Sequence, residues 1–157
     1  MTLSLTKNDE RKLQHILHDL AEHAEADGCL LCGEVGHVIA QQGVNSDDSQ
    51  IISALGAGVF SASRELARIL GEDGFSAVVH QGERKSIYIG AVNPEVLLVV
   101  VFSVEASLGL VKLYAAPAAA AMRSILEEIR TAGHSRTLNE EPLILSDNAD
   151  IFKTATT

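Results

Sequence analysis

Two cysteines three residues apart are the part of this sequence that most resembles a chemical motif. Cys29 and Cys32 form a CxxC pair, a spacing found in zinc sites and redox-active dithiols. They lie, however, in the apolar run GCLLC, which is typical of a β-strand. Residues three apart on a strand point to opposite faces, about 10 Å apart, whereas a disulfide needs Cα atoms within about 7 Å. With no second cysteine pair to complete a zinc site, we expect two buried, unreactive thiols.

The other residues with chemical potential also lack the partners that catalysis or metal binding requires. His15 and His18 are three apart on an expected helix, but no further metal ligands are spaced near them. No serine or cysteine nucleophile is arranged around His37 or His80, and the sequence contains no GxxxxGK[ST] phosphate-binding loop. We therefore expect no catalytic residues, no metal site and no cofactor, which means a protein that is not itself an enzyme.

Composition narrows the class of partner. The chain has 157 residues, enough for one domain, and 46% of them are hydrophobic, which disfavours wholesale disorder. A formal net charge of −9 argues against binding to nucleic acid, whose phosphates would be repelled. The longest apolar run, residues 96–102, is too short to span a bilayer, and the N-terminus does not resemble a secretory signal. We expect a cytoplasmic protein that contacts neither nucleic acid nor membrane.

Hydrophobic periodicity predicts three helices and five strands. The helices are expected over residues 7–24, 50–70 and 107–130, and the strands over 29–32, 37–41, 75–80, 85–92 and 95–102. The last strand, EVLLVVVF, is apolar on both faces and should lie in the middle of the sheet. The predicted fold class is α/β (α+β): a five-stranded, mostly antiparallel sheet in the order α-β-β-α-β-β-β-α, with helices on both faces.

The composition changes after residue 130. We expect residues 1–130 to form the domain and the polar, aperiodic stretch 131–142 to be a flexible linker. Residues 143–157 form a tail in which LILSDNADIF has enough apolar residues for a short helix. Because a helix so short is unstable alone, we expect it to order on a partner. Its candidate contacts are Leu143, Ile144, Ile151 and Phe152.

The second expected helix has an unusual distribution of small residues. One stripe reads as an ordinary core face: Ile52, Leu55, Val59, Leu66 and Leu70. The other side has Ala54, Ala57, Gly58, Ser61, Glu65 and Arg68. Glycine inside a helix costs about 1 kcal/mol relative to alanine, so a compensating gain is expected, such as close approach of another backbone. We favour a protein–protein surface; the alternative is packing under a loop or against the chain's own terminal helix.

Several of these local sequences together resemble the Roadblock/dynein light chain family. The resemblance lies in the turn GEVGHVIA, the small-residue helix ALGAGVFSASRELARILGE, and the strands VVHQGERKSIYIGAV and LLVVVF. Within the family, HQGERKSIYI followed by VVVFSVEASLGLVKL is similar to the bacterial MglB-like subgroup. The match covers roughly residues 10 to 130, and the tail LILSDNADIF resembles the subgroup's C-terminal helix.

This resemblance implies a homodimer. In the family, the second helix packs against its symmetry mate and the third strand pairs across the two-fold axis, which extends the sheet from one protomer into the next. The interface residues implied for this chain are Phe75, Ala77, Val79, Ala54 and Gly58.

The resemblance also implies a partner, a small Ras-like GTPase whose GTP hydrolysis the dimer stimulates in bacterial cell polarity or gliding motility. The implied contacts are Ala54, Ala57, Gly58, Ser61, Arg64, Glu65, Arg68 and the four tail residues. Activators of this subgroup insert no arginine into the GTPase, so Arg64, Arg68 and Arg84 are not expected to act as arginine fingers. The link to polarity adds a cell pole as a candidate location within the cytoplasm.

One departure from the subgroup keeps other functions open. Glu65 stands where subgroup helices tend to have a small residue, and Arg64 and Arg68 flank it. The added charge is compatible with a Roadblock scaffold or adaptor that binds a GTPase, or a larger assembly, without activating it. A small-ligand sensor is a further alternative, which predicts a sizeable cavity; the low aromatic content of 4% argues against it.

Overall fold

The computed structural model describes the backbone of residues 3–155 and the side chains of residues 3–133. The helices are α1 (Lys7–His23), α2 (Ser46–Leu70) and α3 (Leu108–Ala155). The strands are β1 (Gly28–Gly33), β2 (Val38–Gln42), β3 (Ala77–Gln81), β4 (Lys85–Asn93) and β5 (Val96–Ser103). This is the predicted order of elements, and most predicted boundaries differ from the observed ones by only a few residues.

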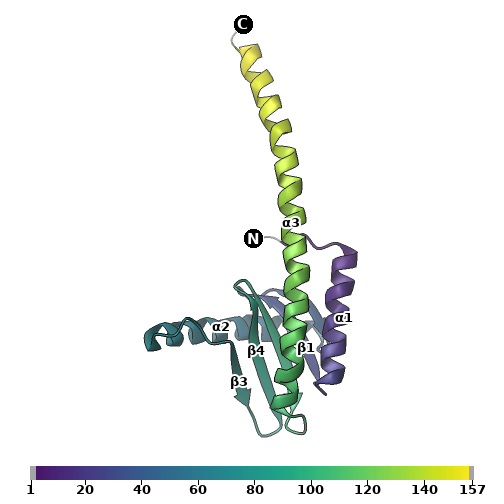
Figure 1. Cartoon of the computed structure of the whole chain (residues 1–157), viewed down its shortest axis with the longest axis vertical. Coiled ribbons are helices and arrows are strands. Elements are labelled where there is room, and N and C mark those ends of the chain that lie inside the picture. Colours follow the sequence, from purple (N-terminus) through teal and green to yellow (C-terminus); the bar gives the residue numbers. More distant parts are fainter. Residues whose placement is uncertain (1–2, 156–157) are drawn as a thin grey trace.

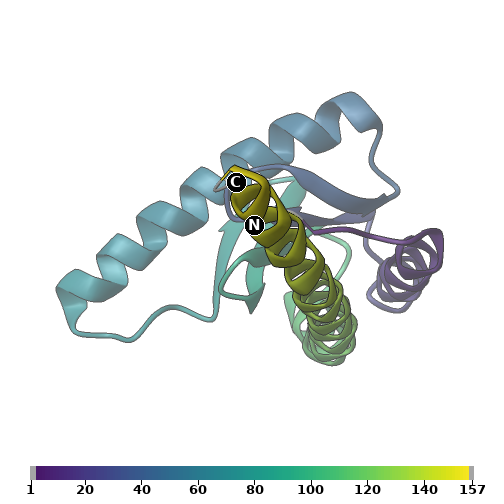
Figure 2. The same cartoon turned by 90° about the horizontal axis from the view of Figure 1, so that it is seen from above.

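All five strands form one antiparallel sheet in the order β2-β1-β5-β4-β3. Helices α1 and α3 cover one face of the sheet, while α2 crosses the other (Figures 1 and 2). The C-terminal end of α2 extends past the β3 edge, so part of this helix has no strand beneath it. The predicted α+β fold is confirmed.

The central strand divides two cores. In β5, Leu98 and Val100 pack under α1 and α3, whereas Leu97 and Val99 pack under α2. The larger core includes Leu13, Leu17 and Leu20 of α1 together with α3 residues such as Met122. The core under α2 is smaller, and Phe60 is the one large side chain that α2 buries in it.

Helix α1 begins at a capping box formed by Thr6 and Asp9. The hydroxyl of Thr6 accepts a hydrogen bond from the Asp9 backbone N–H (3.2 Å), and the Asp9 carboxylate accepts one from the Thr6 N–H (3.0 Å). This exchange satisfies two backbone donors that the first helical turn would otherwise leave unpaired. The helix therefore begins where its sequence predicts.

Helix α3 is longer than expected. We predicted an end at residue 130 followed by a flexible linker over 131–142, but the backbone is helical without a break to Ala155 (Figure 1). Within residues 131–142, Gly133 and Pro142 strongly disfavour a helix, whereas the polar residues between them do not forbid one. The Thr131 hydroxyl also donates to the Glu127 carbonyl (2.9 Å) within the last described turns. The division of the chain at residues 130 and 142 remains a prediction.

Three strand ends are joined by one exposed polar cluster. The Asp27 carboxylate, just before β1, accepts from Lys85 Nζ of β4 (2.6 Å) and from Ser103 Oγ of β5 (3.1 Å). The pKa of Asp27 lies below its usual value, mainly because Lys85 donates a hydrogen bond to its carboxylate; the bond from Ser103 also lowers this pKa. The cluster therefore favours the ionised carboxylate in the folded state.

We predict that Asp27→Asn lowers the free energy of unfolding at neutral pH, by less than about 1 kcal/mol because the pair is exposed. A lowered pKa gives stability that is present above the ordinary value of 3.8 and is lost as the pH falls through the folded-state value. The difference between wild type and variant should therefore shrink on acidification. Urea unfolding at neutral pH and again at about pH 3 checks this; a constant difference would contradict it.

A second stability prediction concerns a serine on the buried face of α2. The Ser49 hydroxyl is buried and has no hydrogen-bond partner among the described residues. Ser49→Ala should raise the free energy of unfolding by about 0.5–1 kcal/mol, because it removes an unsatisfied polar group and favours the helix. In the control Ser107→Ala, α3 loses the bond from the Leu110 N–H to Ser107 Oγ (3.2 Å), which should cost about 1 kcal/mol. The midpoints of urea unfolding, measured for both variants and the wild type at the same protein concentration, test this prediction. A midpoint for Ser49→Ala below that of the wild type would contradict it.

Candidate functional site

Helix α2 meets the sheet through small side chains, so the helix is rotated about its axis relative to the expected orientation. Its buried residues are Ser49, Ser53, Gly56, Ala57, Phe60, Ser63 and Ala67. The stripe that we interpreted as the core face is wrong for Leu55, Leu66 and Leu70, which are exposed; Ile52 and Val59 are half-buried at its border. Small residues allow the helix to lie close to the sheet, and therefore the large apolar residues are the ones turned outward.

Ala57 must be corrected for the same reason. We expected it on the partner-binding face, but it is only 6% exposed and packs in the core between α2 and the sheet. A partner could not reach it without opening that core. Ala54, Gly58 and Ser61 are exposed as expected, as are Arg64, Glu65 and Arg68.

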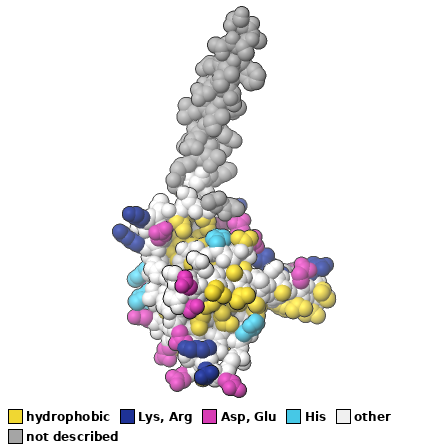
Figure 3. Space-filling model, turned by 180° about the vertical axis from the view of Figure 1, so that it is seen from behind, with side chains coloured by type: hydrophobic (Ala, Val, Ile, Leu, Met, Phe, Trp, Pro, Cys, Tyr) yellow, Lys and Arg dark blue, Asp and Glu magenta, His cyan; other side chains and the backbone are white. Residues whose placement is uncertain are grey.

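The outward face of α2 is strongly apolar. Ile51, Leu55, Leu66, Ile69 and Leu70 are each between 57% and 73% exposed. Figure 3 shows hydrophobic side chains gathered on the projecting end of α2 and across the middle of the same side of the molecule. Burying one such side chain is worth about 1.5–3 kcal/mol. While these side chains stay exposed to water this free energy is not gained, and an exposed apolar surface of this kind is typical of interaction sites.

The small residues on this face fall into two groups. A Cβ at Gly58 would meet nothing within 4 Å, so the space above it is open. At Ala54, in contrast, the β1–β2 turn already lies close, since a Cβ at Gly36 would come 2.9 Å from the Ala54 Cα. The β1–β2 turn therefore limits how closely another chain can approach at Ala54, although Ala54 itself is exposed, while Gly58 remains free for another backbone.

Both arginines on α2 are engaged within the protomer. Arg64 bonds to the Glu34 carboxylate of the β1–β2 turn through two nitrogens (3.2 and 3.3 Å) and lies over the Phe60 ring. Arg68 bonds to Glu65 one turn earlier (3.0 and 3.1 Å). Each guanidinium would have to leave a carboxylate before it could reach into a partner. The arrangement is consistent with arginines that shape the surface instead of entering another active site.

One edge of the sheet presents unpaired backbone groups. Two backbone hydrogen bonds flank the pairing of β3 with β4: Gly82 N–H to Lys85 O (3.0 Å) and Ala91 N–H to Ser76 O (3.4 Å). In an antiparallel pair, residues that bond to the neighbouring strand alternate with residues that do not, so these two bonds show which residues of β3 bond to β4. In this alternation, Ala77 and Val79 direct their N–H and C=O groups away from β4. Phe75, also expected at the interface, precedes β3 and is half-buried.

The opposite edge is capped. The hairpin bond from Gly33 N–H to His37 O (2.8 Å) and the pairing of Gln41 with Leu30 place the Gln41 carbonyl on the outer side of β2. The Gln14 amide of α1 donates a hydrogen bond to that carbonyl (2.5 Å). A side chain that satisfies an edge carbonyl discourages further strand pairing there. The two edges therefore differ, and β3 is the one open to a partner.

The cysteines behave as the strand geometry predicts. Cys29 packs under α1 and α3 and Cys32 packs under α2, so they face opposite sides of the sheet, and both are free thiols. Burial raises the pKa of Cys29 to about 12 and raises that of Cys32 as well. Thiolate formation is therefore disfavoured at both.

The two histidines of α1 lie at the surface, each one turn before an acidic residue. His15 Nε2 is 3.3 Å from the Asp19 carboxylate, and His18 Nε2 is 3.4 Å from the Glu22 carboxylate.

The described part of the chain contains neither a metal-binding cluster nor a membrane-spanning helix. Residues 3–133 contain no cluster of three or more histidine, cysteine or acidic side chains placed to hold a metal ion. No helix in the described part of the chain is both long and apolar enough to cross a membrane. The tail residues Leu143, Ile144, Ile151 and Phe152 lie outside the described side chains.

Comparisons with known proteins agree with this geometry. The Roadblock/LC7 domain profile matches residues 12–102. An MglB structure with a tetrameric arrangement is 32% identical, with a TM-score of 0.77, covering 82% of this chain and 97% of that one. The gliding protein MglB of Thermus thermophilus is also 32% identical, with a TM-score of 0.75 and coverage of 81% and 97%. Myxococcus xanthus MglB is 30% identical, with a TM-score of 0.74 and coverage of 81% and 96%.

No curated protein matches the sequence significantly, so these similarities rest on the domain profile and on solved structures. The profile covers more than half of the chain, and the three MglB structures match more than four fifths of it at 30–32% identity. The chain therefore belongs to the Roadblock/LC7 family, in its MglB-like subgroup.

Proposed function

We propose that this protein is a homodimer that binds a small Ras-like GTPase and stimulates its GTP hydrolysis, as part of gliding motility or cell polarity in the cytoplasm. The observation that supports the dimer most strongly is the exposed apolar face of α2. Similarity to MglB, described in one case as a gliding protein, supports the cellular role. The protein itself contributes no catalytic residues in this proposal; the active site belongs to the GTPase.

The order of residues along α2 suits an antiparallel pair of identical helices. The outward stripe has large residues at both ends, Ile51 with Leu55 and Leu66 with Ile69, and small ones, Gly58 and Ala62, in the middle. If the two-fold axis passes near residue 60, Ile51 meets Ile69 of the partner, Leu55 lies beside its Leu66, and Gly58 faces its Ala62. The small residues let the two backbones approach, and the large ones fill the space on either side.

The β3 edge can join the same two-fold interface. Ala77 and Val79 present unpaired backbone groups, and α2 extends past this edge, so its end would lie over the partner's sheet (Figure 2). An isologous pairing of β3 with its copy satisfies these groups and closes the assembly as a dimer. On the β2 edge, the bond from Gln14 to the Gln41 carbonyl disfavours such pairing.

We predict that Ile69→Glu dissociates the dimer, because each protomer would bury an unpaired carboxylate beside Ile51 of its mate. The matched control is Leu113→Glu on α3, since Leu113 is 64% exposed, close to the 73% of Ile69. Light scattering coupled to size exclusion should give the monomer mass for Ile69→Glu and the dimer mass for the control and the wild type. A dimeric Ile69→Glu, or a monomeric wild type, would contradict the interface.

The activating function is tested on a Ras-like GTPase encoded in the same genome. At saturating protein we expect phosphate release to rise by on the order of tenfold, equivalent to about 1.4 kcal/mol off the barrier. Ser61→Arg should abolish the effect by placing a bulky charge on the α2 face, while Ser124→Arg, at an exposed serine of α3, should not. Arg68→Ala should keep the maximal rate, since no inserted arginine is required. No rise in hydrolysis by the wild type would overturn activation.

The Glu65–Arg68 pair favours one alternative, a scaffold that binds the GTPase without activating it. This exposed ion pair lies on the α2 face where the subgroup tends to have small residues, and it adds bulk between the face and a partner. Binding measured by titration calorimetry together with an unchanged hydrolysis rate would select the scaffold. In that case Glu65→Ala combined with Arg68→Ala should restore a rate increase.

A further inference from the structure

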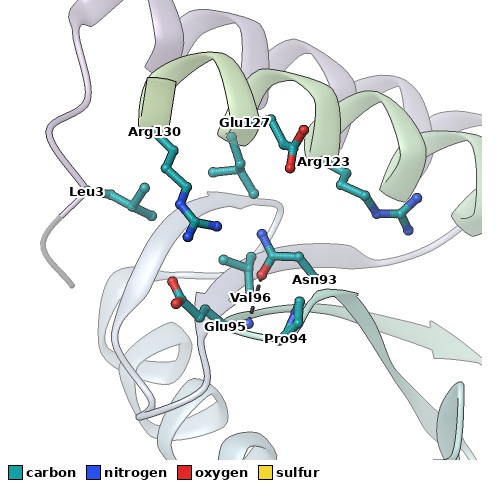
Figure 4. A pocket seen from close by; sticks show the side chains of 9 residues that line it. Leu3, Asn93, Pro94, Glu95, Val96, Arg123, Glu127 and Arg130 are labelled. Atoms are coloured by element: carbon teal, nitrogen blue, oxygen red, sulfur yellow. Dashed lines mark hydrogen bonds between the residues drawn. The ribbon is translucent and has the colours of Figure 1, made fainter. Parts of the chain in front are cut away.

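A cavity of about 250 Å³ lies at the end of the sheet farthest from the β3–β4 turn. We call it the end cavity; it is lined by Leu3, by the β4–β5 turn residues 93–96, and by Arg123, Leu126, Glu127 and Arg130 of α3. Figure 4 shows these side chains between α3 and the turn. The cavity is remote from the α2 face, because α3 and α2 cover opposite faces of the sheet.

The floor of the end cavity is apolar and belongs to the core. Val96 of β5 and Leu126 of α3 are each 3% exposed and belong to the larger core. Leu3 and Pro94 complete the apolar lining from the N-terminal segment and the turn. A volume of this size accommodates a small aliphatic group, and burying that group provides affinity without any rearrangement of the core.

Two hydrogen-bond donors are directed toward the space above this floor. Asn93 Oδ1 accepts a bond from the Glu95 backbone N–H (2.8 Å), which fixes the amide and leaves Nδ2 facing the cavity (Figure 4). The Arg130 guanidinium lies nearby and has no ion pair with any described side chain. Arg123 is already engaged, since its Nε donates to the Val92 carbonyl (2.6 Å). Asn93 and Arg130 are therefore the groups available to an acceptor.

The surrounding charges limit what that acceptor can be. Glu95 and Glu127 also line the cavity, so their two negative charges balance those of Arg123 and Arg130. Both carboxylates repel a phosphate or another dianion more strongly than they repel a single negative charge. A single carboxylate can bond to the Arg130 fork and to Asn93 Nδ2 while an attached aliphatic chain rests on Val96 and Leu126.

We propose that the end cavity binds a monocarboxylate attached to a short aliphatic chain. Two sources share this chemistry: a free short-chain acid, and the C-terminal carboxylate of a peptide whose last residue is aliphatic. The bound ligand would bridge the β4–β5 turn and the part of α3 from which the C-terminal extension leaves the domain (Figure 1). The site is independent of GTPase binding, so neither inference fails with the other.

The test uses the full-length protein and amide chemical shifts recorded during titration. The probes are 4-methylpentanoate for the free acid, acetyl-alanyl-leucine for the peptide end, and 4-methylpentanamide as the uncharged control. We expect saturable shifts at residues 93–96 and 123–130 with at least one acid, and binding of the amide weaker by about tenfold, because it lacks the charge. The acid that binds more tightly identifies the source.

Two substitutions separate recognition of the carboxylate from simple filling of the cavity. Arg130→Gln should weaken binding by about fivefold or more, while Arg84→Gln, at the opposite end of β4, should leave it unchanged. Asn93→Asp keeps the oxygen that accepts from the Glu95 N–H but replaces the donor with a second carboxylate oxygen, and it should abolish binding. The proposal is overturned if neither acid gives saturable shifts, if the amide binds equally well, or if both variants retain wild-type affinity.

Discussion

The packing of α2 on the sheet through small side chains is the interaction on which the rest of the structure depends. Serine, glycine and alanine residues face the strands, with Phe60 as the one large buried group, so the helix lies close to β1 and β5. The largest apolar residues of the helix are instead exposed on the side away from the strands. Five such residues are exposed on this one helix, and an apolar surface of this kind is typical of a site that another protein covers.

The other elements agree with this requirement for a partner. The β3 edge, over which α2 projects, has free backbone groups, whereas Gln14 caps the β2 edge. The two arginines of α2 are held by Glu34 and Glu65, which keeps the rim of the face ordered while its centre at Gly58 stays open. A two-fold partner and a further protein docked across the paired helices would together cover what the protomer exposes.

Much of the fold could be predicted from the sequence, because periodicity and turn residues are local. The start of α1, the burial of β5 on both faces and the opposite orientations of the two cysteines all follow from local sequence patterns. The orientation of α2 could not be predicted, since both sides of this helix contain apolar residues and the usual rule assigns the larger ones to the core. For the same reason Ala57 was assigned to the wrong face. The bond from Gln14 to Gln41 and the end cavity both bring together residues that are far apart in the chain, so no local sequence pattern could predict them.

Hydrogen exchange at the β3 edge tests the proposed homodimer most directly. The N–H groups of Ala77 and Val79 point away from β4, so in a lone protomer they should exchange at the rate of exposed amides. The dimer pairs them with a second β3, and their protection should rise with protein concentration, while the amides that bond to β4 stay protected throughout. Fast exchange at Ala77 and Val79 at every concentration would contradict strand pairing across the two-fold axis.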